Sequence, residues 1–388
     1  MTPNHREHPT RRNQYAIGIM SGTSVDGIDA TLLSISTDQS NPRFKIVATN
    51  SIDLPEPTRK TIHKLNYSGD NEIAQSGALA TELSHYYFQV IEPLIHYSDD
   101  IEISVIGCHG QTVRHYPQGI DGQANHGFTV QLANGAALSQ LSDTPVVTDF
   151  RSADIAQGGQ GAPLAPAFHQ AAFSSLDETR AVINIGGISN ITLLPKDRNQ
   201  SVVGYDIGPG NTLMDQWIRT HQGLAFDKDG AWAKTGQPNQ ALLKKMLLDE
   251  YFKRPIPKST GVDYFNLQWL EHYLQYDATS RPSDQDIQAT LTALTAQTIA
   301  DQINGAHNPI NKAFICGGGA HNSLLMQWLQ DRTDTKIAST EKLGIAPQWV
   351  ESAAFAWMAH RTLHKLPSTL PSVTGAQKPT IAGAIYYP

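Results

Sequence analysis

Short apolar runs alternate with glycine-rich turns in the first half of the chain, and this pattern predicts a hairpin followed by further strands and a helix. Apolar runs at residues 15–20 and 28–36 flank the polar turn SGTSVDG, which is the signature of a β-hairpin. Over residues 77–96 the apolar side chains recur at helical spacing, so a helix is expected there. Additional strands are predicted at residues 43–54, 103–107, 128–132 and 145–148.

The second half of the chain begins with the same plan. Residues 181–185 and 191–194 are apolar runs that flank the glycine turn GGISN. This order of strand, turn and strand repeats that of residues 15–36 and suggests two related lobes, although two unrelated hairpins would give the same pattern. Beyond it the pattern predicts helices at 285–305, 322–331 and 350–365, a buried strand at 312–316, and a proline-rich segment at 367–388 that packs as an edge.

Strands that alternate with helices and hairpins indicate an α/β fold with a mixed sheet in each of two lobes. A chain of 388 residues is also too long for one ordinary core, which favours two domains. We assign residues 1–14 to a disordered tail, residues 15–175 to lobe I and residues 176–388 to lobe II, with the C-terminal segment packing back near lobe I.

Composition and net charge argue against two classes of partner, nucleic acid and membrane, and indicate a cellular compartment. The net charge of -7 argues against a nucleic-acid partner, which usually requires a basic face. No apolar run approaches the roughly 20 residues that span a bilayer, so no membrane partner is expected. Cys108 and Cys316 each end an apolar run and are interpreted as buried thiols of a reduced compartment, which favours the cytoplasm. The oligomeric state is left open, with a homodimer as one alternative.

The turn of the first hairpin, within residues 18–27, carries the first candidate chemistry. Its glycine and hydroxyl residues can direct several backbone N–H groups into one spot, which is how a nest binds anionic oxygens. Asp26 would repel a phosphate directly, so its useful role there is to hold a hydrated Mg²⁺ ion. The alternative is an ordinary hairpin loop. The turn lacks the Gly-Lys-Ser/Thr of a Walker loop.

Two further glycine motifs follow in the second half. The turn within residues 184–190 is a second candidate nest, and two nests could hold a polyphosphate between them. In residues 204–212, Asp206 is predicted to end a short strand, and the following turn feeds a helix near Asn211 or Thr212. A carboxylate placed beside a phosphate site is able to accept a proton from a nucleophile. The alternative is that Asp206 caps the turn.

Other polar motifs admit a functional and a structural interpretation. The glycines at 317–319 would let a flat adenine–ribose group approach the backbone, or would simply allow a close crossing of helix and strand. His109 and Thr112 are expected to donate hydrogen bonds to a polar ligand, whereas a thiol nucleophile at Cys108 is not expected. The run at residues 158–166 is either a hinge or substrate loop or a well-packed connection.

Nine short segments stand in one order along residues 17–358: MSGTSVDGID, CHGQTVRH, DFRSADIAQGGQGAPLAPAFH, NIGGISNIT, YDIGPGNTLMD, DGAWAKTG, KSTGVDYFN, CGGGAHN and PQWVESAAFAW. Each is a weak signature alone, but together they resemble the anhydro-N-acetylmuramic acid kinase family. The resemblance implies the actin-like, sugar-kinase and Hsp70-type ATPase fold, with two RNase H-like lobes and ATP in the cleft between them. Only the N-terminal tail departs from the family pattern.

The same resemblance implies a reaction and its cofactors, ATP and Mg²⁺. Water would open the 1,6-anhydro bond of the sugar while the six-position oxygen takes the γ-phosphate, giving N-acetylmuramate 6-phosphate and ADP in cell-wall recycling. Asp206 would be the general base that deprotonates the water. The nucleotide would be bound by Gly22, Thr23, Ser24, Val25, Asp26, Gly27, Ile28, Asp29, Gly186, Gly187, Gly208, Gly210, Asn211, Gly317, Gly318 and Gly319, and the amino sugar by His109, Thr112, Asp206 and Glu351.

Two other functions are compatible with this fold class, because one fold hosts many activities. The first is a nucleotide-driven chaperone or filament protein, which would require a peptide-binding domain or filament surfaces. The sequence offers no additional domain after residue 365. The second is an ordinary sugar kinase that acts on a free hydroxyl group.

Overall fold

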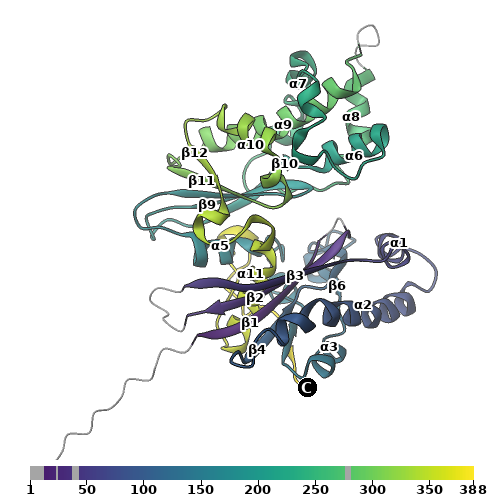
Figure 1. The fold of residues 1–388 in the computed structure, drawn as a ribbon, viewed down its shortest axis with the longest axis vertical. Coiled ribbons are helices and arrows are strands. Elements are labelled where there is room, and N and C mark those ends of the chain that lie inside the picture. The colour runs from purple at the N-terminus through teal and green to yellow at the C-terminus, as the bar shows by residue number, and fades with distance from the viewer. Residues whose placement is uncertain (1–12, 23–24, 37–42, 276–280) are drawn as a thin grey trace, which may run out of the picture. The chain divides into compact units, whose positions relative to one another are not determined.

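The computed structural model describes residues 13–22, 25–36, 43–275 and 281–388. The chain divides into two compact units (Figure 1): the first comprises Met1–Ala172 and Glu351–Pro388, and the second comprises Phe173–Val350. The sequence prediction assigned residues 176–388 to the second lobe and expected the C-terminal segment to pack back near the first. The structure groups the stretch from Glu351 onward with the first unit, because its helix packs on the sheet of that unit.

The first unit is built on a six-stranded mixed sheet in the order β13-β7-β4-β1-β2-β3. Its strands are β1 (Gln14–Ser21), β2 (Gly27–Ile35), β3 (Phe44–Asp53), β4 (Ile103–Cys108), β7 (Val146–Thr148) and β13 (Ala384–Tyr386). β1, β2 and β3 are antiparallel neighbours, which confirms the predicted hairpin, while β4 and β7 run parallel to β1. β13 pairs antiparallel with β7 at the edge.

Helices cover this sheet. They are α1 (Glu56–Leu65), α2 (Glu72–Ile95), α3 (Gly135–Ser142), α4 (Ser152–Ile155), α5 (Ala165–Phe173), α11 (Val350–Leu363) and α12 (Pro371–Thr374). α2 crosses the strands β1–β3 in Figure 1, and Asn50 Nδ2 donates to the carbonyl of Val90 at 2.9 Å. A separate hairpin, β5 (Gln111–Tyr116) and β6 (Phe128–Leu132), carries the polar motif around Thr112. The strand β5 was not predicted.

The second unit has a five-stranded sheet in the order β10-β9-β8-β11-β12. Its strands are β8 (Arg180–Ile185), β9 (Ile188–Leu194), β10 (Val203–Pro209), β11 (Lys312–Cys316) and β12 (Lys336–Ser339). β8, β9 and β10 are antiparallel neighbours, and β11 and β12 run parallel to β8. These strand directions match those of β1, β2, β3, β4 and β7, so the two units share one plan, and the predicted α/β class with a mixed sheet in each lobe is confirmed.

The helices of the second unit are α6 (Thr212–Gln222), α7 (Gln240–Met246), α8 (Leu267–Leu274), α9 (Asp284–Asn304) and α10 (Ser323–Gln330). α9 is buried along most of its length and lies in the main hydrophobic core of this unit, with side chains such as Leu291 and Leu294 fully enclosed. Ser283 caps its first turn by accepting from the N–H of Asp286.

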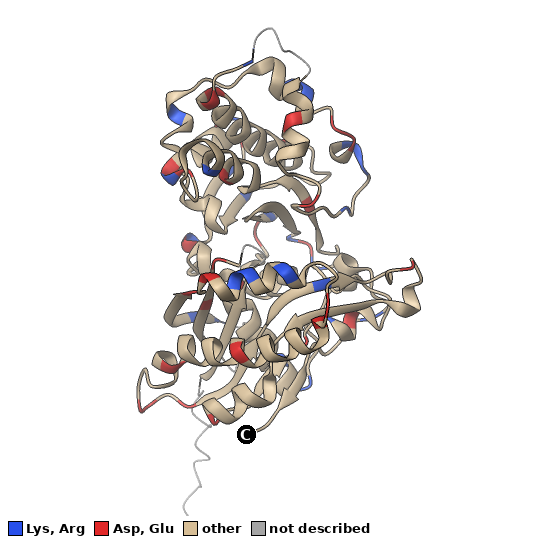
Figure 2. Ribbon diagram, turned by 90° about the vertical axis from the view of Figure 1, so that its right-hand side faces the viewer, with Lys and Arg blue, Asp and Glu red and all other residues tan. Residues whose placement is uncertain are grey.

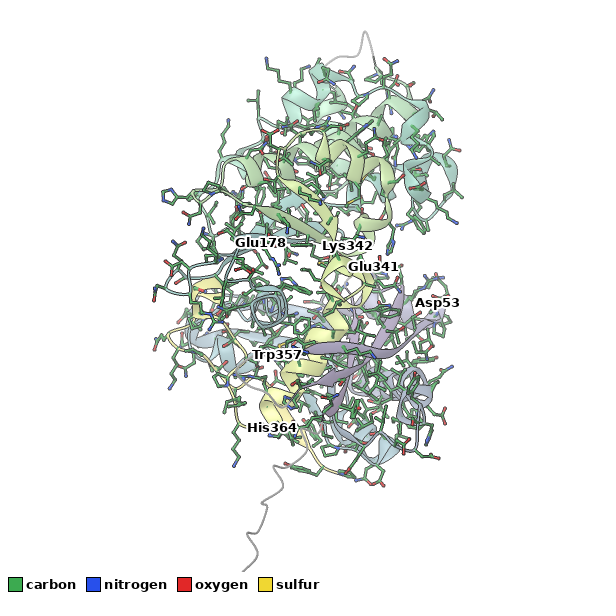
Figure 3. The ribbon with its side chains drawn as sticks, turned by 60° about the vertical axis from the view of Figure 1, so that its left-hand side comes forward. Asp53, Glu178, Glu341, Lys342, Trp357 and His364 are labelled. Atoms are coloured by element: carbon green, nitrogen blue, oxygen red, sulfur yellow. The ribbon has the colours of Figure 1, made fainter. Side chains whose placement is uncertain are left out.

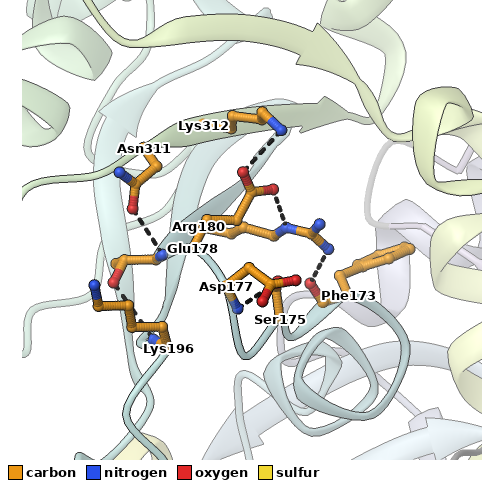
Figure 4. Close-up of polar contacts among 9 residues, drawn as sticks. Phe173, Ser175, Asp177, Glu178, Arg180, Lys196, Asn311 and Lys312 are labelled. Carbon is orange, nitrogen blue, oxygen red and sulfur yellow. Dashed lines mark hydrogen bonds and ion pairs between the residues drawn. The ribbon is translucent and has the colours of Figure 1, made fainter.

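The chain enters the second unit through a polar anchor (Figure 4). The carboxylate of Glu178 accepts from Arg180 Nε and from Lys312 Nζ, each at 2.8 Å. Arg180 also donates to the carbonyl of Phe173 at 2.8 Å. Because Arg180 and Lys312 are paired residues of β8 and β11, this anchor fixes the entering segment to the central strands of the sheet.

Helix α11 belongs to the first unit because it packs directly on the backbone of β1 and β4. A Cβ atom at Gly18 would lie 1.9 Å from the carbonyl oxygen of Ser352, and one at Gly107 would lie 2.2 Å from that of Phe355. Trp357, labelled on this helix in Figure 3, packs against Phe168 of α5 with ring centroids 5.9 Å apart. Only glycine allows the helix to approach the two strands so closely.

We therefore expect Gly18→Ala to lower the free energy of unfolding by about 1–3 kcal/mol, because the added methyl group meets backbone atoms that cannot rotate away. Chemical denaturation monitored by circular dichroism measures this change. Gly77→Ala is the matched control: nothing lies within 4 Å of a Cβ atom there, and the residue is in the interior of α2. The control should raise stability slightly through helix propensity. Equal effects of the two substitutions would contradict the packing argument.

Figure 2 shows basic and acidic residues interspersed along the ribbon of both units. None of the helices in the described part of the chain is long and apolar enough to cross a membrane.

Candidate active site

The candidate residues of the first unit follow the carboxyl ends of neighbouring parallel strands. β1 ends at Ser21 and is followed by Gly22, and β4 ends at Cys108 and is followed by His109. β1 and β4 are parallel, with Ile19 opposite Cys108, so both segments leave the sheet at the same edge. Ligands of α/β proteins commonly bind at such an edge.

The turn between β1 and β2 is held by hydrogen bonds to its own backbone and to β5. The N–H of Val25 donates to the carbonyl of Gly22 at 3.1 Å, and Gln111 Nε2 donates to the same carbonyl at 3.3 Å. Ser21 Oγ also donates to Gln111 Oε1. Asp26 is exposed, and its carbonyl accepts from Leu54. Thr23 and Ser24, both predicted to bind phosphate, lie outside the described residues.

His109 and Arg151 form a polar pair beside this turn. The guanidinium of Arg151 donates to His109 Nε2 from Nε at 3.2 Å and from a terminal nitrogen at 2.8 Å, and it donates to the carbonyl of Gly161 at 2.8 Å. Burial, followed by the positive charge of Arg151, lowers the pKa of His109 well below its usual value. The imidazole is therefore neutral, with its proton on Nδ1, and does not act as an acid through Nε2.

Asp29 and Glu351 are two carboxyl groups of the first unit whose pKa values are both raised by burial. Burial raises the pKa of Asp29, on β2, to about 6. Burial also raises the pKa of Glu351, on α11, against the opposing charge of Arg151, and the charge of Asp29 raises it further. Glu351 therefore links Arg151 and Asp29 electrostatically in one charge cluster, and the sequence did not predict the place of Arg151 in it.

Thr112 belongs to a ladder of polar side chains on the β5–β6 hairpin. Its hydroxyl accepts from Gln131 Nε2 at 3.2 Å, and the same nitrogen donates to Thr129 Oγ1 at 2.6 Å. His115 Nδ1 lies 3.0 Å from Thr129 Oγ1. The Thr112 hydroxyl is thus an acceptor in the bond from Gln131. This bond does not use the hydroxyl hydrogen, with which Thr112 is expected to donate to a ligand.

The glycine-rich run at residues 158–166 is fixed by a buried carboxylate. Asp154 Oδ2 accepts from the N–H of Gly161 at 2.8 Å, and Oδ1 accepts from Thr374 Oγ1 at 2.8 Å. The N–H of Gln160 donates to the carbonyl of Thr374 at 2.8 Å. These contacts favour the well-packed connection over the hinge among the predicted alternatives.

In the second unit the glycine motifs meet at one edge of the sheet. The carbonyl of Gly187 accepts from the N–H groups of Gly210 and Thr212, and that of Gly186 accepts from Asn211 at 2.8 Å. Asn211 Nδ2 further donates to the carbonyl of Ile185 at 3.0 Å. Within the described chain, the N–H groups of Gly186 and Gly187 donate no hydrogen bond, so they are available to an anionic oxygen.

The glycines after β11 lie beside this pair of turns. β8 and β11 are parallel, with Asn184 opposite Cys316, so Gly186 and Gly317 leave the sheet at the same edge. Gly317 has a φ of 77°, and a Cβ atom there would lie 2.2 Å from Asn184 Oδ1. Packing therefore explains Gly317, whereas Gly318 is exposed and has room for a ligand.

Asp206 lies within β10 and does not end it, contrary to the sequence prediction. The strand continues to Pro209, and a register irregularity follows Asp206 where β10 pairs with β9. On the outer side of the strand, the N–H of Asp206 donates to the carbonyl of Lys258 at 3.0 Å. Its carboxylate accepts from the N–H of Thr260 at 3.1 Å, a residue outside the turn that follows β10.

The environment of Asp206 suits a base. Burial raises its pKa to about 6, and the hydrogen bond from Thr260 opposes that rise. The carboxylate is thus ionised at neutral pH yet close to the pH at which it accepts a proton, which is the range that general-base catalysis favours. The hydroxyl of Thr260 is buried and has no hydrogen-bond partner among the described residues.

A row of polar residues next to Asp206 was missed by the sequence reasoning. Asn184, Asn190 and Asp206 are direct cross-strand neighbours on β8, β9 and β10, so their side chains share one face of the sheet. All three are partly exposed. The two asparagines flank the glycines of the predicted turn, and only the register of the sheet reveals that they align with Asp206.

No group of three or more His, Cys, Asp or Glu side chains in the described ranges could hold a metal ion. A Mg²⁺ ion that binds with a nucleotide does not require such a cage, because phosphates and water supply most of its ligands. The exposed Asp26 fits that mode of binding. Cys108 is buried and its thiol has a pKa raised to about 12, so a nucleophilic thiolate does not form there.

Comparison with known proteins shows one family. A family model described as "Anhydro-N-acetylmuramic acid kinase" matches residues 14–388. The chain is 45% identical over 375 residues to a protein of that name from Nitrosomonas europaea, covering 96% of this chain and 99% of the relative. It is 44% identical over 379 residues to one from Bordetella avium, covering 97% of each.

Among solved structures, component A of the (R)-2-hydroxyglutaryl-CoA dehydratase of Acidaminococcus fermentans matches with a TM-score of 0.46 and 13% identity, covering 91% of this chain and 100% of that chain. A likeness of this size carries no argument about activity.

Proposed function

The chain belongs to the anhydro-N-acetylmuramic acid kinase family, and on that premise we propose that it uses ATP to open and phosphorylate 1,6-anhydro-N-acetylmuramic acid. The products are N-acetylmuramate 6-phosphate and ADP, within the recycling of cell-wall sugars. The observation that carries this proposal is the setting of Asp206, a partly exposed carboxylate with a pKa of about 6 in the same sheet as a glycine turn whose N–H groups donate to no described residue.

In the proposed reaction, Asp206 accepts one proton from a water molecule. The oxygen of that water bonds to the anomeric carbon, and the bond from this carbon to the six-position oxygen breaks. The released oxygen bonds to the γ-phosphorus, and ADP leaves. Positioning and charge neutralisation are the main requirements of such a phosphoryl transfer.

The remaining candidate residues are assigned to binding. We propose that the segment from Gly22 to Asp29 and the turn at Gly186–Gly187 hold the phosphates, together with Gly208, Gly210 and Asn211. The glycines at 317–319 lie near the nucleoside. His109, Thr112 and Glu351 contact the amino sugar. A Mg²⁺ ion held at Asp26 would neutralise phosphate charge when bound.

The pKa of Asp206 predicts the pH dependence of the reaction. A general base is active as the carboxylate, so kcat should fall as the pH drops through about 6. A pH profile of kcat measures this acid limb. Asp29 has a pKa of about 6 as well, so the profile of Asp29→Asn separates the two groups. If the acid limb disappears in Asp29→Asn, it reports the titration of Asp29, and its assignment to Asp206 is wrong.

A substrate panel tests the proposed specificity. Release of ADP should require 1,6-anhydro-N-acetylmuramic acid and should be absent with free hexoses and free amino sugars. Comparable rates with a free amino sugar would indicate an ordinary sugar kinase. ADP release without sugar that peptides stimulate would indicate the chaperone-like alternative. Because the reaction consumes ATP, the cytoplasm is the compartment in which we expect it.

A further inference from the structure

Asp206 depends on a segment distant in sequence for three of its contacts. β10 is an edge strand, and its free side is completed by residues 251–260, which are not a strand. The N–H of Asp206 donates to the carbonyl of Lys258, and its carbonyl accepts from the hydroxyl of Tyr251 at 2.8 Å. The donor to its carboxylate, the N–H of Thr260, lies on the same segment. The position of this segment therefore sets both the backbone and the carboxylate of Asp206.

The segment is held together by Lys258 and Tyr251. Lys258 Nζ donates to the carbonyls of Tyr251 and Phe252, each at 3.2 Å, and lies 4.6 Å from the centre of the Tyr251 ring. The side chain of Tyr251 is fully buried. These contacts close the segment on itself, so a displacement of Tyr251 would be transmitted to Lys258 and to the residues that follow it.

Asp249 anchors this segment through an unusual set of donors. Its Oδ1 accepts from the N–H of Tyr251 and from the hydroxyl of Tyr264, both at 2.8 Å. Its Oδ2 accepts from Trp269 Nε1 at 2.8 Å and from the hydroxyl of Tyr273 at 2.9 Å. A carboxyl group accepts from four donors in its ionised form, in which both oxygens are acceptors only. Although burial raises the pKa of Asp249, these hydrogen bonds lower it to below its ordinary value.

We propose that Asp249 is a positioning residue for the reaction, which acts through Tyr251 and the 258–260 segment to hold Asp206 in register. This inference rests on the proposed role of Asp206 as base. Asp249 does not contact Asp206. It fixes the aromatic side chains of Tyr264, Trp269 and Tyr273 around the start of residues 251–260, the segment that contacts Asp206. Small displacements of a catalytic group have large effects on rate, because reacting atoms must be aligned.

Asp249→Asn tests the proposal, because the amide cannot accept from all four donors. We expect kcat to fall by about 10- to 100-fold, with the KM values for ATP and sugar unchanged. The acid limb of the pH profile should move to higher pH, because the hydrogen bond from Thr260 lowers the pKa of Asp206 and would be weakened. Tyr251, Lys253, Arg254 and Lys258 are the ionisable groups on residues 251–260, the segment that packs against Asp206, and none of them changes in this variant.

Glu250→Gln is the matched control, since it removes a neighbouring, exposed charge whose ion-pair partner among the described residues is Arg254 at 3.0 Å. It should leave kcat and the pH profile unchanged. A folded Asp249→Asn with a normal kcat and a normal pH profile overturns the proposal. A fall in the melting temperature of Asp249→Asn with an unchanged pH profile also overturns the proposal, because it shows a purely structural role.

If Asp249→Asn does not fold, Tyr251→Phe decides the question. It keeps the buried ring and removes only the hydroxyl that donates to the carbonyl of Asp206. A shifted acid limb in this variant supports transmission through Tyr251, and an unchanged profile refutes it. Asp206→Asn measured in parallel separates this inference from the proposed function. If Asp206→Asn is active, the base assignment fails. If it is inactive while the profiles of the other variants are normal, only the positioning role fails.

Discussion

Replacement of Asp206 by Asn should lower kcat by about 100- to 10,000-fold and leave the affinity for ATP unchanged. The amide keeps the size of the side chain but cannot accept the proton of the attacking water. Its oxygen can still accept from the N–H of Thr260, so the local structure should be retained. Steady-state kinetics and a nucleotide-binding titration measure the two quantities separately.

Asp197→Asn provides a control for this substitution. Asp197 is an exposed acid of the same unit, and its carboxylate accepts from the N–H of Asn199 within a turn. This control variant should retain normal kinetics. Near-normal turnover in Asp206→Asn would remove Asp206 from the role of base, and a loss of ATP binding would place it in the nucleotide site instead.

Replacement of Arg151 by Met should produce the largest loss of stability, about 2–4 kcal/mol in the free energy of unfolding. The substitution leaves His109 Nε2 and the carbonyl of Gly161 without their donor. It also leaves Glu351 and Asp154 without the positive charge that interacts with them. Urea denaturation measures the change.

Arg114→Met is the control for Arg151. The guanidinium of Arg114 pairs with Glu72 at 3.0 Å; the Glu72 side chain is 41% exposed and that of Arg114 is 16% exposed, so solvent screens the pair from the side of Glu72. We expect its loss to cost less than about 1 kcal/mol. If Arg151→Met is no more destabilising than Arg114→Met, the charge cluster around Arg151 does not support the fold as described.

The hairpins were predictable because their information is local. An apolar run, a glycine turn and a second apolar run specify β1–β2 and β8–β9 without reference to the rest of the chain. Helix α2 was predicted to begin at residue 77 but begins at Glu72, because none of residues 72–78 is buried and they give no apolar period. Asn71, with a left-handed φ of 54°, precedes that start.

The surroundings of the candidate site could not be predicted in the same way. Asp206 and Thr260 are 54 residues apart, and no local pattern links a strand residue to a distant N–H group. The pairing of His109 with Arg151 also joins two strand ends that only the parallel order of β4 and β7 brings together. The placement of α11 with the first unit required the close approach to Gly18 and Gly107.

The alignment of Asn184 and Asn190 with Asp206 could be found only from the register of the sheet. Both lie in a motif that was singled out for its glycines, yet their alignment with Asp206 follows from the pairing of three strands. A glycine motif is visible in the letters of the sequence, whereas a row across a sheet is not.

The central claim is that water, and not a hydroxyl group of the sugar, is the nucleophile that Asp206 activates. The direct measurement is turnover of ATP and 1,6-anhydro-N-acetylmuramic acid in ¹⁸O-water, with mass spectrometry of the sugar phosphate. Product made in ordinary water and then transferred to ¹⁸O-water corrects for exchange of the anomeric oxygen. The proposed reaction predicts one ¹⁸O on the anomeric carbon at each turnover and none in the phosphate. Label found solely in the phosphate, or no label on the sugar beyond that of the exchange control, would contradict it.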